Sequence, residues 1–198
     1  MKKFIFSLIF CFILVAVGAQ NVPIVKDSLS QKNNKEFVFF KKLLDSSNTF
    51  YNEGEYTKSL ELNIEILDLA FKMDDPYLIH QGYRYLGYDY LIIADTLLAV
   101  ESFKKSEKYA ILSKNDTATG VTYMDLANIY AFKKNYKKAL RYHDKSIEFF
   151  SKIKDSAGLA KAHYNTVFTA FDDENYTKAY HHIIKAKELV KFEDHNSF

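Results

Sequence analysis

Residues 135–150, "NYKKALRYHDKSIEFF", carry the pattern that decides the fold. Close variants of this stretch stand at residues 175–190, "NYTKAYHHIIKAKELV", and at residues 55–70, "EYTKSLELNIEILDLA". The later copy begins forty residues after the first, and the earlier copy begins twice that distance before it. A phrase that recurs at a fixed interval of tens of residues indicates a repeat architecture in which each copy is one small structural unit.

The forty-residue interval extends over four units, because other positions follow the same spacing. Small residues or aromatic rings recur at equivalent places in most units, and the intervening charged residues vary. The two clearest series are Tyr56, Thr96, Tyr136, Tyr176 and Ser59, Ala99, Ala139, Ala179. We therefore expect a repeat domain over residues 36–198, with units at about 40–79, 80–119, 120–159 and 160–198.

Each unit is predicted to contain two helices. Residues 117–134, "TATGVTYMDLANIYAFKK", have apolar side chains at helical spacing, and residues 136–153 have the same periodicity. The chain holds only 6 Gly and 2 Pro, which are too few turn-forming residues for an all-β protein of this length. Asp75-Pro76, Asn115-Asp116 and Asp155-Ser156 lie in the same repeat register and are residues that begin helices.

Small residues are expected where the two helices of a pair cross. Gly87 and Ala127 lie in first helices, and Ala139 and Ala179 lie in second helices, where a larger side chain would push the backbones apart. One such pair cannot bury its apolar face alone, so neighbouring pairs must stack. The sequence therefore predicts an all-α solenoid of four antiparallel helix pairs.

The spacing of several motifs resembles the tetratricopeptide repeat. The motifs are "LGYDY…A…F" from Leu86 to Phe103, "LANIY…NY..AL" at 126–140 and "NY.KA" at 175–179. The resemblance covers about residues 36–192 and is to a long-period bacterial variant of the family. It implies a right-handed superhelix whose first helices line a concave groove, and a non-enzymatic role in binding a protein or peptide partner.

The resemblance also implies which residues line the groove. Tyr and Phe offer large contact areas, and Asn can bond a peptide backbone. The groove candidates are Asn48, Tyr51, Arg84, Tyr85, Tyr88, Asn128, Phe132, Tyr164, Phe168 and Phe171. In the third unit, Val121, Met124 and Asp125 also occupy groove positions, although all candidates have packing between helix pairs as an alternative role. The carboxylate clamp known in part of the family is absent, because Leu44 and Asp125 stand at its Lys and Arg positions.

No catalytic, cofactor or metal site is expected. The sequence has no G-x-S-x-G elbow, no phosphate-binding Gly loop and no dinucleotide fingerprint. Of the six His, His143 and His163 are the two expected to face each other across stacked pairs, and His181 and His182 point apart on one helix. Two imidazoles without a carboxylate pattern do not make a metal site. His143 is better explained as a residue packed between helices beside Ala139.

The first 19 residues have the composition of a secretory signal peptide. "MKK" is followed by the apolar run from Phe4 to Val17 and by small residues before Gln20. We expect cleavage after Ala19, with an uncleaved anchor as the alternative, and a flexible leader over residues 20–35. The mature protein is then periplasmic or secreted in a bacterium and has no stable membrane insertion.

Cleavage of this segment would also remove the charge excess and the only Cys. The chain has 27 Lys and Arg residues, and loss of Lys2 and Lys3 leaves 25 against 25 acidic residues. A neutral chain is not expected to bind nucleic acid, because nucleic-acid binding proteins normally carry a basic excess.

The last helix of the fourth unit has apolar residues without a following polar capping helix. Ile183, Ile184, Leu189 and Val190 are therefore expected to meet a partner or a second copy of the chain. The sequence predicts an exported interaction module that holds a peptide or helix in an aromatic groove. The alternative is a sensory input module, or a shortened relative, of a bacterial histidine kinase or helix-turn-helix regulator.

Overall fold

The computed structural model describes residues 34–195, and the residues from Lys35 onward form one compact unit. The predicted signal peptide and most of the predicted leader, up to residue 33, lie outside the described residues. Within the described range every regular element is an α-helix. The helices are α2 (Asn34–Asn52), α3 (Tyr56–Lys72), α4 (Pro76–Ile92), α5 (Thr96–Leu112), α6 (Asp116–Phe132), α7 (Tyr136–Lys152), α8 (Ser156–Asp172) and α9 (Tyr176–His195).

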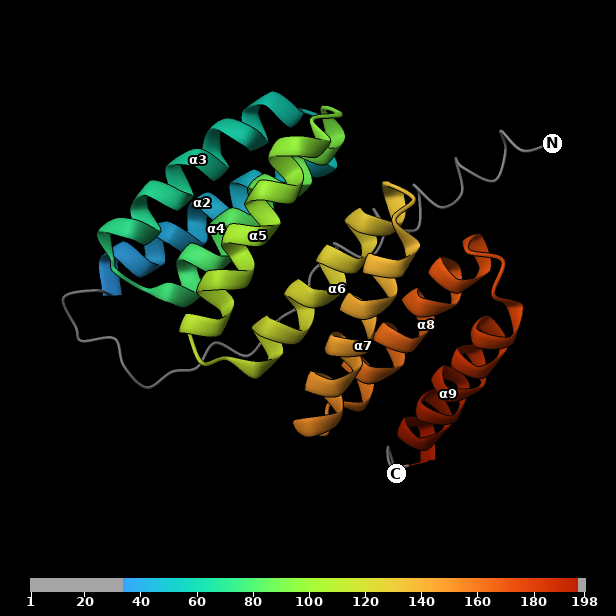
Figure 1. The fold of residues 1–198 in the computed structure, drawn as a ribbon. Coiled ribbons are helices and arrows are strands. Elements are labelled where there is room, and N and C mark those ends of the chain that lie inside the picture. The colour runs from blue at the N-terminus through green and yellow to red at the C-terminus, as the bar shows by residue number, and fades with distance from the viewer. Residues whose placement is uncertain (1–33, 196–198) are drawn as a thin grey trace. The chain divides into compact units, whose positions relative to one another are not determined.

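Successive helices pack as hairpins that stack in chain order, as Figure 1 shows. Helices α4 and α5, α6 and α7, and α8 and α9 form the closest pairs, and α2 is joined to α3 by buried hydrogen bonds. Neighbouring hairpins meet through α3 with α4, α5 with α6, and α7 with α8. First helices also touch one another, α4 with α6 and α6 with α8. The predicted all-α solenoid of four helix pairs is confirmed.

Each helix from α2 to α8 is followed, two positions after its last residue, by a residue with a left-handed backbone conformation. These residues have φ between 51° and 82°, and they recur every twenty positions: Gly54, Asp74, Ala94, Lys114, Lys134, Lys154 and Glu174. In five of these seven turns the backbone N–H of the next residue donates back to a helix carbonyl, for example from Asp95 to the Tyr90 carbonyl at 2.8 Å. This is the geometry of a left-handed C-terminal cap. One helix and its turn therefore occupy twenty residues, and one hairpin occupies forty.

The predicted helix starts are confirmed by side-chain caps. Asp75 accepts hydrogen bonds from the backbone N–H groups of Tyr77 and Leu78. Asn115 and Asp155 accept them in the same way at the starts of α6 and α8. Each cap satisfies an N–H group that the helix itself leaves without a partner.

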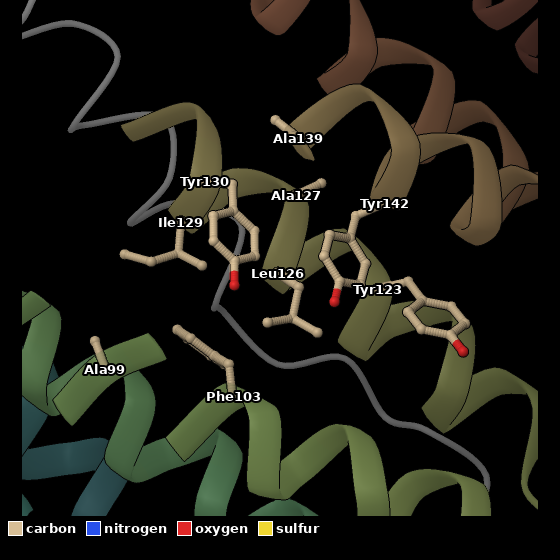
Figure 2. Close-up of a cluster of buried hydrophobic side chains, with 9 residues drawn as sticks. All are labelled: Ala99, Phe103, Tyr123, Leu126, Ala127, Ile129, Tyr130, Ala139 and Tyr142. Atoms are coloured by element: carbon tan, nitrogen blue, oxygen red, sulfur yellow. The ribbon is translucent and has the colours of Figure 1, made fainter. Parts of the chain in front are cut away.

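The main core lies where α5, α6 and α7 meet, as Figure 2 shows. Phe103 from α5 packs against Leu126 and Ile129 of α6, and all three are almost completely buried. Residues Ala127 and Ala139 are also inaccessible to solvent, as their small size predicts. At Gly87 an added Cβ would lie 2.8 Å from the Phe103 ring, so α4 and α5 cross closely only because this residue has no side chain.

The crossing at Gly87 gives a stability test. Gly87→Ala would add about 1 kcal/mol of helix propensity at an open site, but here the methyl group overlaps the buried Phe103 ring. We expect the substitution to lower the free energy of unfolding by about 1–2 kcal/mol, as overpacking of cores commonly does. Denaturant unfolding of the single variant measures this change. In a Phe103→Leu background the same substitution should lose its penalty, and an equal penalty in both backgrounds would contradict the proposed overlap.

Candidate functional site

The ten predicted groove residues all lie on the first helix of a hairpin. Asn48 and Tyr51 belong to α2, and Asn128 and Phe132 belong to α6. Helix α4 carries Arg84, Tyr85 and Tyr88, and helix α8 carries Tyr164, Phe168 and Phe171. None of the ten is fully buried, so each has some surface that a ligand could reach.

Four of these aromatic side chains are exposed: Phe132 on α6, at 42%, and three on α8. Tyr164, Phe168 and Phe171 are 39%, 38% and 59% exposed. The rings of Tyr164 and Phe168 meet edge to face with their centroids 4.9 Å apart, and Phe171 makes a similar contact with Tyr176 across the turn, at 5.3 Å. Aromatic rings held in this way present a large apolar surface whose rotamers are already restricted. Helix α8 is therefore the part of the predicted site with the most accessible apolar surface.

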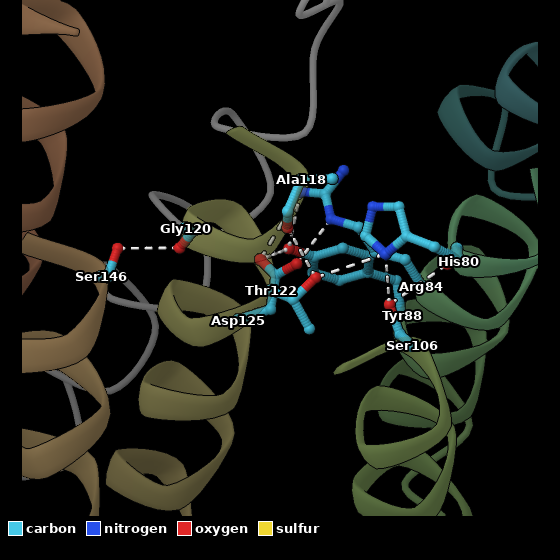
Figure 3. A network of polar contacts seen from close by, with 9 residues as sticks. All are labelled: His80, Arg84, Tyr88, Ser106, Ala118, Gly120, Thr122, Asp125 and Ser146. Carbon is cyan, nitrogen blue, oxygen red and sulfur yellow. Dashed lines mark hydrogen bonds and ion pairs between the residues drawn. The ribbon is translucent and has the colours of Figure 1, made fainter. Parts of the chain in front are cut away.

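The middle of the predicted site is occupied by an ion pair. The Arg84 Nε donates to Asp125 Oδ2 at 2.5 Å, and the Tyr88 hydroxyl also donates to Asp125, as Figure 3 shows. Burial raises the pKa of Tyr88 well above its ordinary value, and the charge on Asp125 raises it further, so the hydroxyl keeps its proton. The Arg84 guanidinium also lies over the Tyr88 ring at 5.4 Å. These contacts fix α4 against α6.

This ion pair corrects part of the sequence interpretation. Val121, Met124 and Asp125 were expected at the groove surface, but all three are buried. Helix α6 lies between α5 and α7 and also touches α4 and α8, so most of its circumference is covered. A central first helix therefore has less free surface than the family pattern implies.

A second polar cluster joins α2, α3 and α4, and all its members are almost inaccessible to solvent. Asn63 Nδ2 donates to Asp89 at 2.6 Å, and the Ser59 hydroxyl donates to the other carboxylate oxygen at 3.1 Å. Ser47 completes the cluster by donating to Asn63 Oδ1 at 2.8 Å. Burial raises the pKa of Asp89 to about 6, although its hydrogen bonds oppose this shift. Sequence reasoning missed Asp89, although it stands in register with the apolar Ile129.

Two buried His side chains form hydrogen bonds that the sequence did not predict. His80 Nδ1 lies 2.8 Å from the Ser106 hydroxyl, which also approaches the His80 carbonyl (Figure 3). His143 is inaccessible to solvent, as predicted, and its Nε2 lies 2.9 Å from the Thr169 hydroxyl. Burial lowers the pKa of each imidazole to about 3, so both rings are neutral at ordinary pH.

His163, which was predicted to approach His143, has its hydrogen-bond partner on the helix that follows it. His163 Nδ1 lies 2.8 Å from His182 Nδ1, which joins α8 to α9. Burial lowers the pKa of both rings, and neighbouring Lys and His charges lower it further. At neutral pH the N–H group of one ring donates a hydrogen bond to the ring nitrogen of the other. This hydrogen bond connects the two helices of one hairpin.

Two other kinds of site are absent from residues 34–195. No group of three or more His, Cys, Asp and Glu side chains in this range could hold a metal ion. No helix in the same range has the length and apolar content needed to cross a membrane.

Comparison with solved structures identifies the fold. The structure of MamA is similar over 83% of this chain and 82% of the MamA chain, with a TM-score of 0.58 and 17% identity. Tetratricopeptide-like repeats of a kinesin light chain from Podospora anserina match at a TM-score of 0.65, with 10% identity over 80% of this chain and 77% of their own. The fold is that of a tetratricopeptide-repeat solenoid. No family model matches the sequence, and no curated protein matches it either.

Parts of two larger proteins have similar structures. Aspartyl phosphate phosphatase F from Bacillus subtilis matches with a TM-score of 0.72 and 16% identity over 84% of this chain. The chain spans 43% of that protein and 43% of RapI, which matches with a TM-score of 0.69 and 19% identity over 78% of this chain. At these identities the similarity establishes the shared fold.

The Arg84–Asp125 pair can be tested by a double-mutant cycle. Asp125→Ala leaves the guanidinium partly buried without its partner, and we expect it to lower the free energy of unfolding by about 3 kcal/mol. Replacing both groups by apolar side chains, Arg84→Met with Asp125→Leu, should cost much less than the sum of the single changes. Denaturant unfolding measures all of these variants. Additive losses would show that the pair is not coupled.

The buried His predict acid sensitivity. The folded pKa values of His80 and His143 lie below the ordinary 6.5, so the unfolded chain binds more protons as the pH falls below 6.5. The free energy of unfolding should fall by about 1.4 kcal/mol per pH unit for each His. Asp89 acts in the opposite direction, because its raised pKa stabilises the fold as the pH falls from about 6 towards 3.8.

His143→Phe isolates one of these contributions, because Phe103 fills the same position in the preceding hairpin. Unfolding free energies are measured from pH 7.5 to pH 4.5, and below pH 6.5 they should decline less steeply in the variant, by about 1.4 kcal/mol per pH unit. Parallel pH profiles for the variant and the original chain would rule out His143 as a source of acid sensitivity.

Proposed function

We propose that this chain is an exported, non-enzymatic module that binds a peptide or a helix of a partner protein. The observation that carries this proposal is the exposed aromatic face of α8, formed by Tyr164, Phe168 and Phe171. Aromatic residues of this kind dominate the binding energy of many protein interfaces, because they bury much area and lose little rotamer freedom. Export to the periplasm or beyond rests on the apolar segment within residues 1–19.

The partner surface is expected to be apolar at its centre and polar at its edges. Tyr164 and Phe168 offer an apolar contact, while Asn128 on α6 and Tyr85 on α4 carry groups that can form hydrogen bonds. A helix with apolar side chains on one face, or an extended peptide with alternating apolar residues, has this complementarity. The buried Asp125 carboxylate already accepts hydrogen bonds from Arg84 and Tyr88. The main role of these three groups is therefore to hold α4 against α6.

A second candidate function is that of an input module for a signalling protein. One structural neighbour is a signal transduction ATPase with a tetratricopeptide-repeat sensor from Pyrococcus horikoshii, with a TM-score of 0.66 and 20% identity. The similar region covers 85% of this chain and 26% of that protein. In this second function, the partner of the α8 face would be a histidine kinase or a helix-turn-helix regulator.

The α8 face can be tested by substitution and capture. Tyr164→Ala combined with Phe168→Ala removes both rings of the exposed pair, and we expect it to lower retention of the partner at least tenfold. The immobilised chain and the variant are exposed to the same native envelope extract, and retained proteins are quantified by mass spectrometry. A kinase or regulator among the proteins lost would favour the signalling function.

A matched control carries two exposed apolar substitutions away from this face, Phe71→Ala and Leu97→Ala. The control should retain the partner as well as the original chain does, and all variants should melt cooperatively. If the α8 variant also retains the partner while its fold is intact, the α8 face is not the binding surface.

A further inference from the structure

The outer face of α9 is formed by residues whose equivalents in the other second helices, α3, α5 and α7, are buried. Ile183 is equivalent to Asn63, Phe103 and His143, which are at most 1% exposed, yet Ile183 is 37% exposed. Val190 is 52% exposed, while its equivalents Ala70, Ala110 and Phe150 are also at most 1% exposed. Tyr180 adds an even more exposed ring to the same face.

In the earlier hairpins a following first helix covers these positions. Asn63 of α3 bonds Asp89 of α4, and His143 of α7 contacts Thr169 of α8. Phe103 of α5 packs into the core that α6 provides. The α9 face therefore has the form of a helix-docking surface, and its apolar side chains would be stabilised by another helix.

Helix α2 of a second copy is a poor occupant for this face. Each covering helix carries a small or short residue at the close approach, Gly82, Thr122 or Ala162, and all three are buried. At Gly82 even a Cβ would lie 3.0 Å from the side chain of Leu67. Helix α2 has the exposed Lys42 at this position, and α9 has the exposed Lys187 where α3 has Leu67. Head-to-tail stacking would therefore press two Lys side chains together in a tight contact.

Helix α9 is complementary to itself instead. Tyr180 and Lys187 lie at equal distances along the helix on either side of Ile183 and Ile184. An antiparallel pair of α9 helices would place the Ile side chains at the centre and each Lys187 beside a Tyr180 ring of the other copy. Contacts of this kind already occur between helices of this chain, where Lys145 lies 4.8 Å from the Tyr123 ring centroid.

We propose that a second copy of the chain covers this face, with α9 packed antiparallel against α9 in a two-fold dimer. Such an interface is closed, because the α9 helix of each copy is already paired with the other. Further copies are not added at the other end, because Lys42 on α2 disfavours head-to-tail stacking. The dimer leaves the α8 face free, so it is independent of the partner binding proposed above.

Sedimentation equilibrium of protein purified from cells that express the full coding sequence tests this inference. The original chain should be a dimer, and Ile183→Lys should give a monomer, because it places two charges at the centre of the interface. Val38→Lys is the matched control, since Val38 is exposed on α2 at the other end of the unit. This control should remain a dimer, and circular dichroism melting should show that both variants fold.

Three results of the sedimentation experiment would overturn the dimer. They are a monomeric original chain at every soluble concentration, a dimer that survives Ile183→Lys, or a ladder of larger assemblies. The ladder would indicate head-to-tail stacking despite Lys42 and Lys187. Cross-linking that joins α9 only to a different protein would replace the second copy with that partner.

Discussion

The tight turn after each helix is the constraint on which the rest of this structure depends. From α2 to α8 a left-handed residue recurs every twenty positions, and the helix that follows begins two residues later. Because the helices α3 to α8 all have seventeen residues, the same side-chain position meets the same neighbour in every hairpin. An insertion of one residue in a helix would rotate its buried face by about 100° and break this correspondence. The repeat thus preserves contacts more strictly than it preserves residue types.

The junctions between hairpins show what this constraint allows. One position on a second helix meets one position on the next first helix, and the paired residues match in polarity. The pair is Asn63 with Asp89 at the first junction and His143 with Thr169 at the third. At the second junction the equivalent residues, Phe103 and Ile129, are both apolar members of the core. Docking two hairpins in the wrong order would place a polar group against an apolar one, and a buried polar group without a partner is costly. These pairs therefore favour one order of stacking.

Much of the fold followed from the sequence because helical periodicity and small crossing residues are local signals. Ala127, Ala139 and the helix caps Asp75, Asn115 and Asp155 were predicted in the places where the structure has them. The left-handed turn residues were not predicted, since Lys and Glu at these positions give no sign of a positive φ. Their twenty-residue spacing becomes visible only with the backbone angles.

The candidate site was less predictable, because its state depends on contacts between hairpins. Arg84 and Asp125 are forty-one residues apart, and nothing in either local stretch shows that they form an ion pair. The same limit applies to the burial of Val121 and Met124 and to the pairing of His163 with His182. In contrast, the exposure of the three rings on α8 follows from a local signal, because helix periodicity alone decides which side of α8 they occupy.

The most direct test of the binding role is a footprint of the chain with its captured partner. Hydroxyl-radical labelling measures the reactivity of each Tyr and Phe side chain with and without the partner. The account predicts protection at Tyr164, Phe168 and Phe171, with little change at Phe71 on α3. Protection confined to the second helices, with α8 as reactive as in the free chain, would contradict it.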